Sequence, residues 1–168
     1  MAGYKGHTFG AAFFVVMYVL VIALAPFSLF ASSVGLLSNE QTLAGLMIVG
    51  MLFGLWPDID TNSRGQDIFF AVAFITDIAL IWAGRLEAAA YLGLLAMTPI
   101  VGKHRGWTHS RIAMILVPLP IVLIPYVYNH NNMTVAILFY GAAITGYFSH
   151  LFLDGLITKK FHIKSKKW

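Results

Sequence analysis

Two short motifs place histidine and aspartate at spacings that suit metal binding. His150 and Asp154 are four residues apart, so on a helix both side chains point the same way and can share one ion. Asp58 and Asp60 follow Pro57 and are two residues apart, so both can flank one cation in extended or turned backbone. Carboxylate and neutral imidazole together suit Zn²⁺, Mn²⁺ or Fe²⁺. The motifs therefore predict a divalent metal site.

Three further histidines extend this set of ligands. His104 and His109 bracket Gly106, which allows a sharp bend, and His7 precedes the first apolar segment. The chain has no Cys, so any metal must be held by nitrogen and oxygen. We expect one or two ions, because the candidate ligands are more than the four that one tetrahedral ion binds. Zinc is the expected metal, with manganese or iron as alternatives. The candidate metal ligands are His7, Asp58, Asp60, His104, His109, His150 and Asp154.

Basic residues next to these motifs indicate an anionic substrate. Lys103, Arg105 and Arg64 are candidates to bind a phosphate group. A metal ion lowers the pKa of bound water to about 7, so hydrolysis is the expected chemistry. Arg105 would stabilise the developing negative charge, although it could equally pair with an Asp or anchor the topology. The expected catalytic residues are Asp58, Asp60, Arg105 and His109, with one carboxylate as general base.

The composition is that of a membrane protein. Of the 168 residues, 59% are hydrophobic and 11% are charged, and the mean hydropathy is +0.78. An average soluble domain is about 45–50% apolar and about 25% charged. A soluble core of this size could not hide so much apolar surface, so lipid must solvate much of it.

Six apolar segments predict an all-α integral membrane bundle with about six transmembrane or partly re-entrant helices. The second, third and fourth segments are short for a bilayer core, which takes about 17–25 helical residues. Gly45, Gly50 and Gly54 in the second segment would permit close helix packing, or could be ordinary membrane glycines. Thr108 and Ser110 are candidates to cap the fifth segment. The segments are 9–30, 42–56, 68–83, 87–101, 110–128 and 133–156.

The Lys and Arg residues predict the orientation of the bundle. With six spans, one side receives most of them and the other side receives only Arg85, which places both termini in the cytoplasm. The His and Asp motifs fall on that same side, although they took no part in the count. We therefore expect a metal site at the cytoplasmic end of a single domain, residues 1–158, followed by a basic tail, residues 159–168.

The motifs resemble the signature blocks of the YdjM family of predicted inner-membrane metal-dependent hydrolases. The blocks are GLWPDID at 54–60, HRGWTHS at 104–110 and HLFLD at 150–154, and His7 matches the family's N-terminal His. The resemblance runs from residue 7 to about residue 158. It implies a bacterial inner-membrane location and a metal-dependent hydrolase activity. More distantly, the blocks are similar to those of zinc-dependent phospholipases C and related nucleases, which implies a phosphoester substrate.

Three functions remain open at this point. The first is a hydrolase that cleaves a phosphoester of a lipid or another membrane-associated substrate. The second is a protein whose metal only holds the bundle together, in which case the ion would be fully enclosed. The third is a metal-ion transporter, for which Asp77 is the one strong relay candidate. Membrane lipids are expected partners, nucleic acid is not expected because anionic lipid explains the lysine tail equally well, and the oligomeric state is open.

Overall fold

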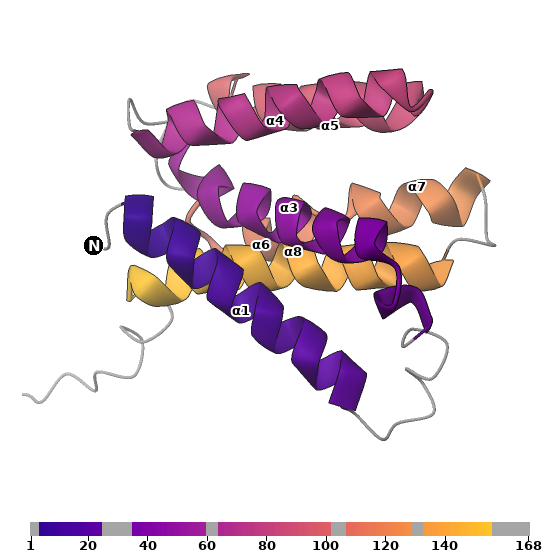
Figure 1. Cartoon of the computed structure of the whole chain (residues 1–168). Coiled ribbons are helices and arrows are strands. Elements are labelled where there is room, and N and C mark those ends of the chain that lie inside the picture. Colours follow the sequence, from indigo (N-terminus) through magenta and orange to yellow (C-terminus); the bar gives the residue numbers. More distant parts are fainter. Residues whose placement is uncertain (1–3, 25–34, 60–63, 102–106, 129–132, 156–168) are drawn as a thin grey trace, which may run out of the picture.

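The computed structural model describes residues 4–24, 35–59, 64–101, 107–128 and 133–155 (Figure 1). These residues fold into helices without a β-strand, which confirms the all-α prediction. The helices are α1 (Tyr4–Leu24), α3 (Glu40–Leu55), the short 3₁₀ helix η2 (Trp56–Asp58), α4 (Arg64–Trp82), α5 (Leu86–Val101), α6 (Arg111–Leu116), α7 (Pro120–Tyr128) and α8 (Met133–Leu153).

Local sequence signals explain where the helices at the site begin and end. Asn39 caps α3, since its side chain accepts hydrogen bonds from the backbone N–H groups of Gln41 and Thr42. Pro57 stops α3 and tightens the chain into η2. The last turn of α8 is followed by Gly155, whose φ of 68° lies in the left-handed region that favours glycine and terminates helices.

The prediction of one continuous helix over residues 110–128 is wrong. The structure has two helices there, α6 and α7, separated by residues 117–119. Pro118 carries no backbone N–H and its ring clashes with the preceding turn, so α6 ends before it, whereas Pro120 is the first residue of α7, a position that tolerates proline. Ser110 caps α6, because its Oγ accepts a hydrogen bond of 3.0 Å from the Ala113 N–H. The capping prediction is therefore confirmed for Ser110.

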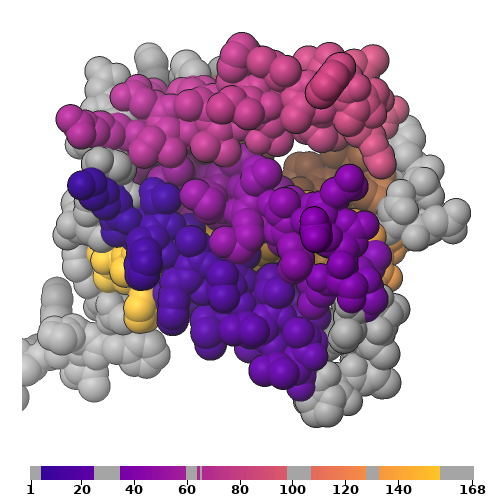
Figure 2. Space-filling view, viewed as in Figure 1, coloured from indigo at the N-terminus to yellow at the C-terminus, as the bar shows by residue number. Residues whose placement is uncertain are grey.

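The helices pack in two layers (Figure 1). The lower layer contains α3 and α8 side by side, α1 crossing both, and α7 along α8. The antiparallel pair α4 and α5 forms the upper layer and contacts the lower one through α3 and η2. Figure 2 shows that α1, α3 and the α4–α5 layer make much of one face of the molecule, and that the end of α8 reaches this face near the start of α1.

Small residues bring α1, α3 and α8 into close contact. A Cβ added to Gly146 of α8 would overlap the backbone carbonyl of Gly50 in α3. A Cβ added to Gly54 would meet the side chain of Ala11 in α1. In lipid, such small residues replace hydrophobicity as the main packing device. The close packing expected of Gly50 and Gly54 is confirmed.

The outer faces of the helices are strongly apolar, as expected of a membrane protein. Phe9 on α1, Phe74 on α4 and Trp82 at the end of α4 are 75%, 67% and 93% exposed. Among the described helices, α1 and α8 are long and apolar enough to cross a membrane alone, and α5 and the α6–α7 stretch are shorter apolar segments. The six expected segments are thus helical, with the fifth divided, but six membrane spans remain a prediction.

We expect Gly146→Ala to destabilise the bundle. The added methyl group would push against the Gly50 backbone and lower the free energy of unfolding by about 1–3 kcal/mol. Gly93→Ala in α5 is the matched control, since nothing lies within 4 Å of its added Cβ, and it should raise the stability by up to about 1 kcal/mol. Unfolding in detergent micelles measures both variants, and equal stability would contradict the close crossing.

Candidate metal site

Four distant chain segments meet at one end of the bundle. His7 lies in the second turn of α1, Asp58 ends η2, His109 lies in the loop before α6, and His150 and Asp154 lie at the end of α8. The start of α1, the end of α3 and the end of α8 gather at the left of Figure 1, near the marked N-terminus. The structure therefore brings together five of the seven candidate ligands.

The three imidazoles point their Nε2 atoms at the two carboxylates. His109 Nε2 lies 3.4 Å from Asp58 Oδ1 and 3.8 Å from Asp154 Oδ2. His150 Nε2 lies 3.6 Å from each of the same two oxygens. His7 Nε2 lies 3.5 Å from Asp154 Oδ1 and 3.9 Å from Asp58 Oδ2. Three nitrogen donors and two carboxylates thus converge on one small volume.

These separations fit the geometry of a bound metal ion. Ligand atoms placed tetrahedrally about 2.0–2.2 Å from zinc lie about 3.3–3.6 Å from one another. The Nε2 atoms of His109 and His150 are 3.4 Å apart, and the contacts of both with the carboxylates span 3.4–3.8 Å. Because neutral imidazole and carboxylate are ligands that zinc prefers, both the donor types and the spacing suit it.

The tautomer of His150 favours a cation in the cluster. Its Nδ1 lies 2.9 Å from the carbonyl oxygen of Gly54, which can only accept, so Nδ1 carries the proton. In the neutral ring, Nε2 then presents a lone pair toward Asp58 and Asp154. A lone pair facing two carboxylates is repulsive unless a cation lies between them. A hydrogen bond from the second ring nitrogen to a backbone carbonyl is also the usual way to orient a metal-binding histidine.

Two buried polar atoms in the cluster have no hydrogen-bond partner among the described residues. They are His7 Nδ1 and Asp154 Oδ1. The Asp154 side chain is only 5% exposed and follows the last turn of α8, where the helix dipole disfavours a negative charge. A buried polar group without a partner costs about 1–3 kcal/mol, and more if it is charged. A bound cation would compensate the Asp154 carboxylate.

The loop that carries His109 is held against α8 and η2 by buried neighbours. Thr108 Oγ1 lies 3.2 Å from His109 Nδ1, which leaves Nε2 toward the cluster. The Tyr147 hydroxyl donates a hydrogen bond to the Thr108 carbonyl. Trp107 packs edge-on against the fully buried Trp56 with ring centroids 5.5 Å apart. These contacts fix the position of His109 relative to α8.

The protein environment favours the ionised form of Asp58. Burial raises the pKa of this carboxyl, but in the metal-free cluster a hydrogen bond with His109 and the attraction of His150, His7 and His109 in their protonated forms together outweigh burial. The net effect lowers the pKa of Asp58 below its usual value. Asp58 is therefore a carboxylate at neutral pH, the form that binds a cation or accepts a proton.

The other predicted site residues lie elsewhere or outside the described residues. Arg64 begins α4 with an exposed side chain and forms no ion pair with the described carboxylates, so the structure does not place it in the cluster. Asp77 lies in the second half of α4, away from the end of the bundle that carries the cluster. The predictions for Asp60, Lys103, His104 and Arg105 fall outside the described residues.

Sequence reasoning missed the groups that orient the ligands. The Gly54 carbonyl, which receives the His150 Nδ1–H, is a backbone atom, and no side-chain motif reveals it. Its only sequence signal is the Gly50–Gly54 spacing, which predicts that another helix approaches closely there. Tyr147 lies one helical turn before His150 on α8, so the two side chains share a face of that helix, and this spacing is the sequence signal for Tyr147.

An apolar helical bundle with a buried cluster of histidine and aspartate at one end defines a membrane protein with a candidate metal site. The chain belongs to the YdjM inner membrane protein family, whose model matches residues 5–163. This match confirms the family resemblance and supports the membrane location. Comparisons with curated proteins and with solved structures give no match.

We expect Asp154→Asn to weaken metal binding and leave the metal-free protein at least as stable as the wild type. The amide cannot neutralise a cation, so zinc affinity should fall by about 10–100-fold or more. Without metal, the substitution removes one of two negative charges that face the His150 lone pair.

Competition with a chelator measures the affinity, and thermal unfolding with and without zinc measures the stability. Asp67→Asn is the matched control, because Asp67 is exposed in the first turn of α4. The same zinc affinity in both variants would rule out Asp154 as a ligand.

Proposed function

We propose that the chain is a membrane-bound metal-dependent hydrolase that cleaves a phosphoester of a lipid or another membrane-associated substrate. The observation that supports this proposal most is the convergence of three imidazoles and two carboxylates at a site that is open on one side. His7 and His150 are 2% and 0% exposed, whereas His109 and Asp58 are 19% and 30% exposed. An ion held only for structure would be enclosed, and a catalytic ion keeps an accessible position.

The residues divide into those that hold the ion and those that meet the substrate. His7, His150 and Asp154 form the buried part of the cluster, and His109 and Asp58 form its accessible edge. A zinc ion bound there would supply a water molecule with a pKa of about 7. Asp58 is the more exposed of the two carboxylates and is ionised, so it is the better placed to accept a proton from water.

An anionic substrate at the lipid boundary agrees with the surroundings of the site. The exposed Arg111 follows the His109 loop directly, and the sequence adds Lys103 and Arg105 on the other side of that loop. Basic side chains favour phosphate. Because the cluster lies at the ends of apolar helices, an amphiphile would approach from the lipid while water arrives from the adjacent solution.

We place the site on the cytoplasmic face of the inner membrane. The support is the distribution of Lys and Arg, which leaves only Arg85 on the opposite side if six segments span. The chain has no Cys, so single cysteines introduced at Lys5 and Arg85 give a clean labelling test. An impermeant thiol reagent outside the inner membrane should label the second position and not the first, and the reverse pattern would invert the topology.

The hydrolase function is tested by turnover of a phosphodiester and a phosphomonoester panel with purified, zinc-loaded protein. We expect hydrolysis that a chelator abolishes and zinc restores. Asp58→Asn should lower kcat by about 10²–10⁴-fold, since this is the range for a lost general base. His109→Ala should lower both zinc content and kcat, and Asp67→Asn, which lies outside the cluster, serves as the control.

Two outcomes would replace this proposal. Full zinc occupancy without turnover of either ester class would leave a structural metal. Zinc uptake into proteoliposomes that Asp77→Asn abolishes would favour transport, for which the buried Asp77 Oδ1, without a hydrogen-bond partner among the described residues, is the supporting observation. Turnover retained in both Asp58→Asn and His109→Ala would refute the residue assignment.

A further inference from the structure

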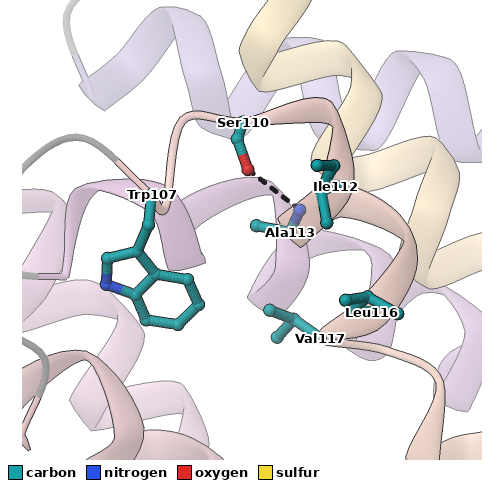
Figure 3. A pocket seen from close by; sticks show the side chains of 6 residues that line it. All are labelled: Trp107, Ser110, Ile112, Ala113, Leu116 and Val117. Atoms are coloured by element: carbon teal, nitrogen blue, oxygen red, sulfur yellow. Dashed lines mark hydrogen bonds between the residues drawn. The ribbon is translucent and has the colours of Figure 1, made fainter.

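An apolar groove lies beside α6, next to the candidate metal site. Its volume is about 530 Å³, within the range of about 300–1,000 Å³ that is usual for small-molecule pockets. Figure 3 shows Trp107 on one side of the groove, the side chains of α6 on the other, and Ser110 at the end where the loop enters the helix. The lining residues are Trp107, Ser110, Ile112, Ala113, Leu116 and Val117.

The groove presents hydrocarbon to a ligand and few polar groups. Ser110 Oγ already accepts the Ala113 N–H, as the dashed line in Figure 3 marks. Ile112 and Leu116 are 69% and 56% exposed, although both are large apolar side chains. A polar or peptide ligand would find few hydrogen-bond partners along this lining, whereas a hydrocarbon chain needs none.

The division of the fifth predicted helix shapes the groove. α6 ends at Leu116 after six residues, and Val117 closes its last turn with a hydrogen bond of 2.9 Å to the Ala113 carbonyl. Pro118 prevents the helix from continuing in the same line. The apolar side chains of α6 therefore face Trp107 across an open space.

The groove adjoins the candidate metal site through the loop itself. Trp107 and Ser110, two of its lining residues, flank Thr108 and His109. His109 is part of the accessible edge of the cluster and lies 3.4 Å from Asp58. A ligand with an anionic head and an apolar chain would thus meet a metal ion bound at this edge and hydrocarbon within one short stretch of the protein.

We propose that this groove holds one hydrocarbon chain of an amphiphilic phosphate or phosphonate whose head group lies at the His109–Asp58 edge of the cluster. The position of the head group rests on the proposed function, whereas the seat of the chain rests on the groove. The occupant is a lipid-like hydrocarbon chain because the lining of the groove is apolar and the protein belongs to an inner membrane family. The groove then selects substrates by chain length.

The test is a titration of alkylphosphonates, from ethyl to decyl, into zinc-loaded protein in nanodiscs, followed by calorimetry. Titration into empty nanodiscs measures how much phosphonate partitions into lipid, so that each affinity is calculated from the concentration that remains in water. We expect the affinity of the wild type to rise by about fourfold for each added methylene until the groove is filled. Leu116→Trp and Val117→Phe narrow the groove and should flatten this dependence.

Ile115→Trp is the matched control. Ile115 lies on the same helix and is 48% exposed, but it does not line the groove, so the dependence on chain length should persist. Zinc content measured on each variant verifies that it is folded. A flat dependence in the wild type overturns the proposal whatever the variants do, and so does an equal effect of Ile115→Trp and Leu116→Trp.

The experiments distinguish failure of the groove proposal from failure of the hydrolase proposal. Chain-length-dependent binding without cleavage of any ester would keep the groove and reject the hydrolase. Ester cleavage with no preference for chain length in either binding or kcat/KM would keep the hydrolase and reject the groove.

Discussion

The backbone contact between α3 and α8 at Gly50 and Gly146 is the constraint on which the rest of the site depends. With side chains at these positions the helices would separate, and the Gly54 carbonyl would no longer reach His150 Nδ1. That hydrogen bond determines which nitrogen of His150 faces the carboxylates. The close contact of two glycines therefore determines the tautomer of His150, about one helical turn away.

The existence of the helices was predictable because lipid requires long apolar runs, and each of the six segments contains helix within the residues that the structure describes. The cluster was also predictable in outline, since alternating helices return the segments of His7, Asp58, His109 and Asp154 to one end of the bundle. The division into α6 and α7 was missed, although Pro118 and Pro120 signalled it, because hydropathy alone does not register a missing N–H. The hydrogen bond from His150 to the Gly54 carbonyl could not be predicted, because no side-chain pattern indicates which backbone carbonyl accepts it.

The site combines groups that oppose one another without a cation. Two carboxylates face an imidazole lone pair in a largely buried volume, and Asp154 adds its charge at the negative end of a helix. The packing of Trp56, Trp107 and Tyr147 offsets this cost by holding the loop in place. The aromatic packing thus supports a cluster of groups that repel one another, a combination that is common at functional sites.

The buried and exposed halves of the cluster come from different kinds of structure. His7, His150 and Asp154 belong to α1 and the end of α8, whose close packing excludes solvent. Asp58 and His109 come from a 3₁₀ turn and a loop, which carry partly exposed side chains at the rim. Rigid helices suit the task of holding an ion, and loop positions suit contact with a substrate. The groove beside α6 begins at that same loop, so the more exposed side of the cluster also adjoins an apolar surface.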